Sequence, residues 1–368
     1  MKIVVAKNDL LDIMAPLVEV TKRKDAHALS SHVLLVAEDQ HGLRLSVSQT
    51  PLSLSVNVDA DVKASGSVAV SCVDFSTRIK TLPDGPVAIE AQGTGLVIRS
   101  VGHARRFTLA SVPADDFPRV PTLEDAAWLL VPRETWQELT KTTRFAMSED
   151  CSRPHMNGSL FVWKKDIVRL VATDGYRLAT SHRIVEGSSA SVEALLSRVA
   201  VVTLDTLVNR TKDEAFRVSL QNQDLFAEVG RWRLAARLID AKFPPYEQVI
   251  PKKQPHTIFV GRDMLLDAMR SVLVASDERT SGVRMSIEPG KVRLESASSG
   301  GGDGVDEVPA DYDGPVIKTA INGEYMKDVL AALADDEVKL SLADELSPLV
   351  LQDKDERSHV SVIMPMRV

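Results

Sequence analysis

The stretch VAKNDLLDIM, residues 5–14, has two counterparts further along the chain, and this recurrence decides the fold. The counterparts are VPRETWQELT at 131–140 and VGRDMLLDAM at 260–269. Each begins with Val, has a basic residue two positions later and continues with the apolar spacing of an amphipathic helix. Their first residues are 126 and 129 positions apart, about the length of one small domain. The pattern predicts three copies of one unit.

Two further landmarks recur with a similar spacing. The stretch FTLASVPADDFP ends at Pro118 and RLAARLIDAKFP ends at Pro244, 126 positions later. A second helix-like stretch follows an apolar strand in each copy: AVSCVDFSTRIKTL at 69–82, AVVTLDTLVNRTKD at 200–213 and TAINGEYMKDVLAAL at 319–333. We therefore predict two helices in each unit, and domains at residues 1–124, 125–252 and 253–368.

The remaining segments of each unit have the pattern of strands. Apolar residues alternate with polar ones and β-branched residues are frequent. In the first unit the predicted strands are HVLLVAED (32–39), LRLSVSQ (43–49), LSLSVNV (52–58), VAIEAQ (87–92), GLVIRSV (95–101) and RRFTLAS (105–111). Turn-forming stretches separate the strands, among them PDGP at 83–86, EGSSAS at 186–191 and SSGGGDG at 298–304. The predicted fold class is α+β, with two helices and several antiparallel strands in each of three repeated domains.

Composition excludes several classes of protein. The chain has 368 residues, of which 44% are hydrophobic, enough for folded cores rather than a disordered chain. No run of about 18 apolar residues is present, so we predict no membrane partner. Lys7, Asp9 and Asp12 interrupt the first apolar stretch, which argues against a signal peptide and favours a cytoplasmic protein. Cys72 and Cys151 form no disulfide framework, in agreement with a reducing compartment.

Basic side chains recur on the predicted helices although the net charge of the chain is −7. One helical face of the second unit carries Arg133, Gln137, Lys141 and Arg144, and one face in the third unit carries Arg262 and Arg270. Further cations are Lys22, Arg23, Lys24, Arg78, Lys80, Arg210, Lys212 and Lys327. A solvated surface explains each helix taken alone. Recurrence in three units favours a second interpretation, in which the cations contact DNA phosphates without reading bases.

The sequence lacks the patterns of catalytic and cofactor sites. Its eight histidines are scattered, and none forms HExxH or another metal-ligand spacing. No GxSxG elbow, Walker loop or dinucleotide-binding fingerprint is present. Cys151 has no evident base beside it. We predict no catalytic residue, no metal and no cofactor. A hydrolase or transferase would need a reactive constellation that this sequence does not offer.

The C-terminal stretch SVIMPMRV, residues 361–368, is unusually apolar for the end of a chain. Two explanations are open: an edge strand packed in a core, or part of a binding surface. Both hold together when alternate residues of one strand point to opposite faces.

Seven stretches together resemble one family, the bacterial β sliding clamp, which is the beta subunit of DNA polymerase III. They are FTLASVPADDFP (107–118), RFAMSEDCSRPHMNG (144–158), VATDGYRLA (171–179), FPPYEQVIP (243–251), SGVRM (281–285), INGEYMKDVLAAL (321–333) and VIMPMRV (362–368). The resemblance spans all three units. It implies a head-to-tail homodimer that forms a ring, with helices lining a hole around double-stranded DNA. It also implies three protein partners: the replicative polymerase catalytic subunit, a clamp loader, and other replication and repair proteins with a clamp-binding motif.

The matching motifs also imply a groove for partner peptides between the second and third domains. By resemblance, its residues are Met156, Thr173, Gly175, Tyr176, Arg177, Leu178, Pro244, Val249, Asn322, Tyr325, Val362, Met364, Pro365, Met366 and Arg367. Methionine is flexible and polarisable, which suits a groove that receives leucine and aromatic anchors from several partners. Arg177 and Arg367 are expected to fix polar groups of the peptide. The stretch ATDGYRLA also predicts a hairpin with Asp-Gly at its turn.

The expected DNA contacts and dimer contacts complete the set of candidate residues. The DNA candidates are Lys22, Arg23, Lys24, Arg78, Lys80, Lys141, Arg144, Arg210 and Lys212. For the dimer, the resemblance implies that Phe107 and Leu109 of the first unit meet Val274 of the third. Core positions would explain the same residues.

Several positions depart from the family's pattern. DAHALSSHVLL (25–35) and SVSQTPLSLSV (46–56) replace segments that usually carry Pro and Thr-Asp-Leu, and VVTLDTL (201–207) lacks a common cationic pair. RPH (153–155) stands where aromatic residues stack on single-stranded template, and Gln248 at the groove edge replaces a position that is often basic. The departures keep two alternatives open: a specialised or duplicate clamp with altered partner or inhibitor binding, and a clamp-like protein that loads poorly on DNA.

Overall fold

The computed structural model covers residues 1–368. The structure describes residues 1–22, 29–121, 123, 127–187, 190–297, 301–353 and 358–367. Contacts among them divide the chain into two compact units. Unit 1 comprises Met1–Trp136 and Val202–Leu238, and unit 2 comprises Gln137–Val201 and Ile239–Val368. The second sequence repeat thus contributes to both units.

Each sequence repeat contains two α-helices in the described residues, as predicted. The helices are α1 (Lys7–Thr21), α2 (Cys72–Thr81), α3 (Arg133–Thr143), α4 (Arg198–Val208), α5 (Arg262–Leu273) and α6 (Gly323–Ala332). Three short turns of 3-10 helix are η1 (Ala114–Asp116), η2 (Arg144–Ala146) and η3 (Tyr246–Gln248). The first helix of each pair begins at the basic residue of the repeated opening pattern.

The strands of unit 1 form one antiparallel sheet of 13 strands. They are β1 (Lys2–Ala6), β2 (His32–Glu38), β3 (Gly42–Gln49), β4 (Leu52–Val58), β5 (Asp61–Ala64), β6 (Gly66–Ser71), β7 (Pro86–Gln92), β8 (Gly95–Ser100), β9 (Arg106–Val112), β10 (Leu129–Pro132), β15 (Ala215–Gln221), β16 (Asp224–Val229) and β17 (Trp232–Arg237). Their order is β10-β15-β16-β17-β4-β3-β2-β6-β9-β8-β7-β1-β5. The six strands predicted in the first repeat are confirmed as β2, β3, β4, β7, β8 and β9.

The strands of unit 2 form an antiparallel sheet of 12 strands. They are β11 (Gly158–Lys164), β12 (Ile167–Thr173), β13 (Arg177–Ile184), β14 (Ser191–Ser197), β18 (His256–Gly261), β19 (Gly282–Glu288), β20 (Lys291–Ala297), β21 (Asp303–Asp311), β22 (Ile317–Asn322), β23 (Glu337–Leu342), β24 (Leu349–Asp353) and β25 (His359–Ile363). Their order is β14-β11-β12-β13-β25-β24-β23-β18-β21-β20-β19-β22.

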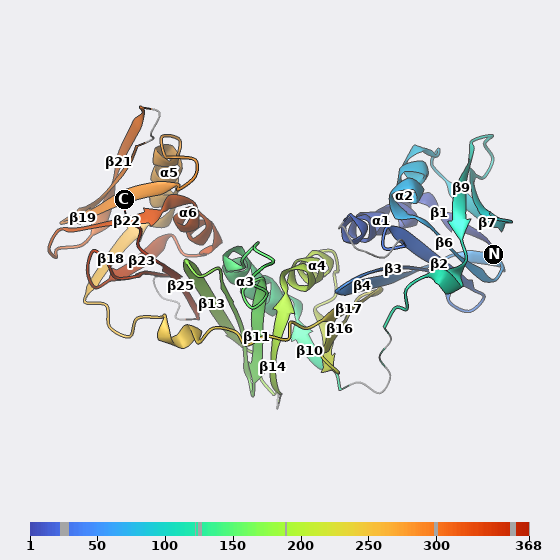
Figure 1. Ribbon diagram of the computed structural model, residues 1–368, viewed down its shortest axis with the longest axis horizontal. Coiled ribbons are helices and arrows are strands. Elements are labelled where there is room, and N and C mark those ends of the chain that lie inside the picture. Colours follow the sequence, from blue (N-terminus) through green and yellow to red (C-terminus); the bar gives the residue numbers. More distant parts are fainter. Residues whose placement is uncertain are drawn as a thin grey trace. The chain divides into compact units, whose positions relative to one another are not determined.

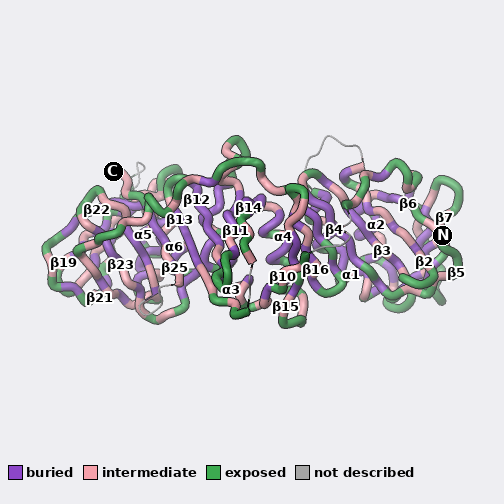
Figure 2. Tube along the Cα trace, turned by 90° about the horizontal axis from the view of Figure 1, so that it is seen from below, coloured by how far each residue is buried: buried purple, intermediate pink, exposed green. Residues whose placement is uncertain are grey.

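Alternation along the strands separates a core face from an outer face. On β2, every second residue is buried, namely Val33, Leu35 and Ala37, and the residues between them are partly exposed. Figure 2 shows buried, intermediate and exposed positions interspersed along the strands of each unit. In unit 1, α1 packs against α2 and lies over β3 and β4 (Figure 1). In unit 2, α5 and α6 pack together in the same way. Each helix pair therefore covers the apolar face of its part of the sheet.

The repeated basic residue fastens the start of the first helix to the end of the second. The side-chain contacts are Lys7 Nζ to Leu82 O at 2.6 Å, Arg133 Nη1 to Thr211 O at 3.3 Å, and Arg262 Nη1 to Leu333 O at 3.0 Å. The carbonyls at a helix C-terminus lack partners within the helix and carry a partial negative charge, so a cation there is stabilising. Arg133 and Arg262 were expected on a DNA-facing surface. Their guanidinium groups are used inside the fold instead.

Two strand pairings of one kind join successive repeats. In unit 1, β4 pairs with β17, with Ser53 opposite Ala235. In unit 2, β13 pairs with β25, with Leu178 opposite Val362. β4, β13 and β21 are equivalent strands of the first, second and third repeats, and each ends a hairpin. β9, β17 and β25 are likewise equivalent, because each is the last strand of its repeat. Among the described residues, 106–110 of β9 and 303–309 of β21 have a strand neighbour on one side only.

Candidate functional site

The turn between β12 and β13 is built by hydrogen bonds within the stretch ATDGYRLA. Oδ1 of Asp174 accepts from the backbone N–H groups of Tyr176 and Arg177, both at 2.9 Å. Thr173 Oγ1 donates to the carbonyl of Arg177 at 2.7 Å and accepts from the N–H of Gly175 at 3.1 Å. Gly175 has φ of 93°, a conformation that glycine adopts without strain. The predicted Asp-Gly hairpin is confirmed, and its turn presents Tyr176 to solvent.

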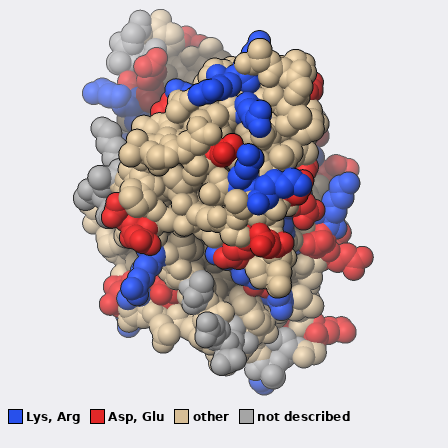
Figure 3. Space-filling view, turned by 90° about the vertical axis from the view of Figure 1, so that its right-hand side faces the viewer, with Lys and Arg blue, Asp and Glu red and all other residues tan. Residues whose placement is uncertain are grey.

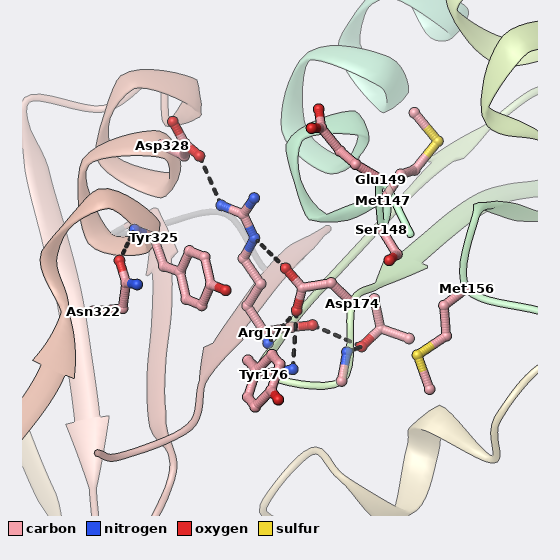
Figure 4. A network of polar contacts seen from close by, with 12 residues as sticks. Met147, Ser148, Glu149, Met156, Asp174, Tyr176, Arg177, Asn322, Tyr325 and Asp328 are labelled. Atoms are coloured by element: carbon pink, nitrogen blue, oxygen red, sulfur yellow. Dashed lines mark hydrogen bonds and ion pairs between the residues drawn. The ribbon is translucent and has the colours of Figure 1, made fainter. Parts of the chain in front are cut away.

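Arg177 is the centre of a polar network in unit 2 (Figure 4). Its Nε donates to Asp174 Oδ2 at 3.0 Å, and its Nη1 donates to Asp328 Oδ2 at 2.7 Å. The guanidinium also lies 4.3 Å from the ring centroid of Tyr325 and 5.5 Å from that of Phe145. Only 12% of the Arg177 side chain is exposed, so these contacts replace most of its hydration. The network links the hairpin of the second repeat to α6 of the third.

Asn322 caps the start of helix α6 and positions the aromatic side chain of Tyr325. Asn322 Oδ1 accepts from the backbone N–H of Tyr325 at 3.2 Å, which is a side-chain N-cap. The pKa of Tyr325 is raised, chiefly by burial and then by the nearby Asp174 carboxylate. The ring therefore stays neutral and offers its face to Arg177. Asn322 and Tyr325, two predicted groove residues, thus act by orienting α6 and Arg177.

The apolar C-terminus is a central strand followed by an extended segment. β25 is hydrogen-bonded to β13 on one side and to β24 on the other, so it is not an edge strand. After β25, Met364 N–H donates to Tyr176 O at 2.9 Å and Met366 N–H donates to Ala320 O at 2.7 Å. Met364 is 39% exposed, whereas Val362 is buried. The terminal residues therefore belong partly to a core and partly to a surface.

A groove of about 100 Å³ opens where these elements meet. It is lined by Met156, Thr173, Gly175, Arg177, Leu178, Pro244, Tyr246, Val249, Val362 and Met364. Below it, Leu178, Val350 and Val362 form an apolar cluster with Tyr246 packed against it. The lining is mostly apolar and its volume is small, which suits one or two side chains of a peptide rather than a cofactor.

Nine of the fifteen predicted groove residues line this groove. The other six are Tyr176, Asn322, Tyr325, Pro365, Met366 and Arg367. The structure adds Tyr246, whose hydroxyl accepts from Arg169 at 3.0 Å and whose ring packs edge-on against Phe243. The sequence signal that could have identified Tyr246 as a groove residue is its aromatic side chain in the linker FPPYEQVIP. The structure also adds Asp174 and Asp328, which hold the Arg177 guanidinium that was expected to bind peptide.

Two departures from the family's pattern lie beside this groove. Arg153, from the RPH stretch, pairs with Asp150 at 2.9 Å and donates to the carbonyl of Asp174 at 3.3 Å. Its Nη1 also lies 3.9 Å from Met156 Sδ. Gln248 lies in η3, beside the groove residue Val249. Arg153 therefore supports the 174–176 turn.

The cations predicted to meet DNA lie at helix ends and on helix surfaces, except for Arg23 and Lys24, which lie outside the described residues. Lys22, Lys80, Lys141, Arg144, Arg210 and Lys212 are exposed, and Arg78 is half-buried. Lys22 pairs with Glu19 and Arg78 with Asp74 on their own helices, while Arg210 donates to the carbonyl of Asp12 at 3.2 Å. Contacts of this exposed kind are weak and screened by salt.

The predicted dimer residues differ in exposure. Val274 follows α5 and is 89% exposed. Phe107 is half-buried and Leu109 is buried, both on β9, where they pair with Ile98 and Leu96 of β8. Leu109 therefore packs within its own unit.

Two kinds of feature are absent from the described part of the chain, a metal-binding cluster and a membrane-spanning helix. This part of the chain holds no group of three or more His, Cys, Asp or Glu side chains arranged to bind a metal ion. Across the same residues, no helix combines the length and apolar character needed to span a bilayer.

Comparisons with known proteins agree with the geometry. Profiles of the DNA polymerase III beta subunit match residues 1–121 (N-terminal domain), 130–245 (central domain) and 247–367 (C-terminal domain). The beta sliding clamp of Proteus mirabilis is 29% identical over 328 residues, covering 88% of this chain and 89% of its own. That of Escherichia coli (strain K12) is 29% identical over 304 residues, 82% of each chain.

Solved structures of sliding clamps share the fold. The DNA polymerase sliding clamp of Pseudomonas aeruginosa superimposes with a TM-score of 0.92 at 25% identity, with both chains covered completely. The beta sliding clamp of C. crescentus gives a TM-score of 0.93 at 26% identity, covering 100% of this chain and 99% of its own. The chain thus belongs to the DNA polymerase III beta subunit family, the bacterial β sliding clamps, and has the clamp fold of three repeated α+β domains.

Proposed function

We propose that this protein is a sliding clamp that encircles duplex DNA as a head-to-tail homodimer and tethers a replicative DNA polymerase. Its domains are residues 1–124, 125–252 and 253–368, and it works in the cytoplasm without catalysing a reaction itself. One observation carries the proposal. Each junction between repeats pairs the same two kinds of strand: β4 with β17, and β13 with β25. The corresponding strands that are left, β9 and β21, each have an edge that faces no strand among the described residues.

A second copy satisfies both of these edges at once. β9 of one copy pairs with β21 of the other, and the reverse pairing closes the ring, because a heterologous contact either closes or propagates. Unpaired edge strands supply the backbone donors and acceptors for this contact. α5 packs on β21, so the exposed Val274 after α5 lies beside the same edge. On the other edge, Phe107 and Leu109 lie in β9 itself and pair with β8, which holds β9 in place.

The two edges carry opposite charges. Arg105, just before β9, and Arg106, its first residue, are exposed, whereas β21 carries Asp303, Asp306 and Glu307, of which Glu307 pairs with Lys291 and Arg293 of β20. The face seen in Figure 3 carries both signs of charge, with Lys and Arg mainly in its upper part and Asp and Glu among and below them. Complementary charge selects the head-to-tail partner over like-with-like pairing.

The proposed ring reconciles the charge of −7 with DNA as a partner. Topological enclosure holds the DNA, so each phosphate contact stays weak and sliding remains fast. The contacts are assigned to Lys22, Arg23, Lys24, Arg78, Lys80, Lys141, Arg144, Arg210 and Lys212. None of them needs to read a base.

The groove at Met364 receives the clamp-binding peptides of partners. These partners are the polymerase catalytic subunit, an ATP-driven clamp loader and other replication and repair proteins. Leucine or aromatic anchors fit an apolar groove whose methionines adapt to different side chains. Arg153 and Gln248 beside the groove favour a specialised or duplicate clamp as the second candidate, with altered partner or inhibitor binding.

A charge exchange tests the dimer. In sedimentation velocity, Arg105→Glu/Arg106→Glu alone and Asp303→Lys/Asp306→Lys alone are expected to be monomeric at concentrations where the wild type is dimeric. An equimolar mixture restores both contacts and gives a 1:1 heterodimer. Lys164→Glu/Arg284→Glu, at exposed positions of other strands, is the control and stays dimeric. A mixture that remains monomeric, or single variants that dimerise normally, would exclude this interface.

A peptide measurement tests the groove. A short Gln-Leu-rich clamp-binding peptide, labelled with fluorescein, is expected to bind saturably and to lose binding in Met364→Ala/Met366→Ala. A folded, dimeric wild type that binds no such peptide would favour the second candidate.

A further inference from the structure

A second pocket lies at the other junction between repeats, in unit 1. It encloses about 330 Å³ between the linker after β9 and the outer faces of β2, β3, β4, β16 and β17. Its apolar lining includes Leu34, Val36, Phe117, Trp128 and Phe226. Phe117 is buried and the other four are half-buried, so the pocket has an apolar floor that solvent reaches.

The pocket is the internal counterpart of the groove at Met364. Phe117 and Pro118 of the first linker line the pocket, and Pro244 of the second linker lines the groove. The second residue of β4, Ser53, faces Ala235 across the junction, where Leu178 faces Val362 in unit 2. Two small side chains thus replace two large ones. Their smaller volume agrees with the larger size of this pocket, about 330 Å³ against about 100 Å³ for the groove.

Among the described residues, the charges around the pocket are predominantly positive. Its rim carries the guanidinium groups of Arg44, Arg119 and Arg233, and that of Arg217 lies over the ring of Trp128. The nearby carboxylates are those of Glu38 and Glu228. Glu124 and Asp125, in the linker between Leu123 and Trp128, lie outside the described residues.

Two of the ion pairs at this rim are loose, whereas Arg217 and Glu228 form a close pair. Arg233 Nε lies 3.4 Å from Glu228 Oε1, and Arg44 Nη2 lies 3.8 Å from Glu38 Oε1. Arg119 is exposed, and the Arg233 side chain is 64% exposed. Exposed pairs of this kind exchange partners at little cost. An incoming carboxylate can therefore take over these guanidinium groups.

We propose that this pocket, which we call the junction pocket, binds an acidic peptide segment of a partner protein. A single leucine or aromatic side chain enters the apolar floor, and flanking Asp or Glu residues pair with Arg119 and Arg233. Apolar burial supplies affinity, and the cations select against the uncharged peptides of the Met364 groove. The protein then holds two partners of different chemistry at two internally equivalent places. The inference goes beyond the proposed clamp function and does not depend on ring closure.

Peptide selection on the whole protein tests the proposal. A random 12-residue phage library is panned against the wild type and, in parallel, against Arg119→Glu/Arg233→Glu. The wild type is expected to enrich peptides that carry two or more acids around one leucine or aromatic residue. The double variant is expected not to enrich them. Recovery of no acidic class, or of the same peptides on both proteins, overturns the proposal.

Binding of the synthesised consensus peptide then locates the site. Fluorescence anisotropy should show binding about tenfold weaker in Arg119→Glu/Arg233→Glu, a loss of about 1.4 kcal/mol. Ser53→Leu, which gives the pocket the floor residue of the groove, should weaken it as well. Lys164→Glu/Arg284→Glu matches the change in net charge and should bind as the wild type does.

The two remaining outcomes separate this pocket from other sites. Met364→Ala/Met366→Ala should leave the acidic peptide bound even if it abolishes binding of the Gln-Leu-rich peptide. An acidic peptide that is lost only in the methionine variant belongs to the groove and contradicts the proposal. Oligothymidine that displaces the peptide and binds in an Arg119- and Arg233-dependent way would instead assign the pocket to nucleic acid.

Discussion

The guanidinium of Arg177 lies 2.7 Å from the carboxylate of Asp328, a residue 151 positions later in the chain. Arg177 starts β13 in the second repeat and Asp328 lies on α6 in the third, so this contact helps to fix the elements that surround the groove. The groove consequently depends on a residue that was expected to touch the ligand but whose donors bind two carboxylates of the protein.

Removing the Arg177 charge is expected to destabilise the fold. In Arg177→Met the Asp174 carboxylate stays buried without its cation, which should lower the free energy of unfolding by about 3 kcal/mol. Urea unfolding measures the change. Lys164→Met, which breaks the exposed pair with Glu193, is the matched control and should have little effect. Equal losses in the two variants would show that the Arg177 network does not stabilise the fold.

The repeated cation at the start of α5 is expected to be structural. Arg262→Met keeps the aliphatic stem but leaves the Leu333 and Ala334 carbonyls without their charged donor, which should cost about 1–2 kcal/mol. Arg270→Met, at an exposed position of the same helix, should be close to neutral. Thermal unfolding of the two variants compares them. A larger loss for Arg270→Met would contradict the assigned role.

Stability should fall below pH 6.5 because of His359. Burial, followed by the nearby Arg183 charge, lowers the pKa of this histidine from 6.5 to about 4 in the folded protein. Between these values the unfolded chain binds the proton more readily, so stability is lost as pH falls. Its share of the loss between pH 7.5 and pH 5 is about 2 kcal/mol.

Urea unfolding at these two pH values checks this effect. His359→Gln should show a smaller difference between them than the wild type, and His41→Gln, at an exposed position, should keep the wild-type difference. An unchanged difference in His359→Gln would rule out His359 as the cause.

The two thiols should differ sharply in reactivity. Cys72 is fully buried, and burial raises its pKa to about 12, whereas Cys151 is exposed. Since the thiolate is the reactive form, Ellman's reagent should titrate one thiol in the native protein and a second only after unfolding. Cys151→Ser should abolish the native reaction. Two fast thiols in the native protein would contradict the burial of Cys72.

Much of the fold was predictable because its units repeat and its strands alternate. The opening patterns at 5–14, 131–140 and 260–269 each begin a helix pair, and the predicted strands of the first repeat are all present. The groove was predictable through motif resemblance at positions such as Met364. The central position of β25 was not, because local alternation does not reveal how many neighbours a strand has.

The roles of individual cations were less predictable. Arg133 shares a helical face with Lys141, and spacing alone makes the two equivalent. Only the folded chain brings Arg133 beside the carbonyl of Thr211, 78 positions away. The same limit applies to Arg177, whose partner Asp328 is set by tertiary contacts. Tyr246 was overlooked because an aromatic residue in a linker has no periodic pattern to place it.

Retention on DNA of different topology tests the sliding-clamp account most directly. Labelled protein is loaded onto nicked circular DNA with a clamp loader and ATP, isolated by gel filtration, and then treated with a nuclease that cuts the circle once. The account predicts that the protein stays with the circle and is lost after linearisation, because free ends release a ring that holds DNA by enclosure. Equal retention on circular and linear DNA, or no retention by a folded dimer on the circle, would contradict it.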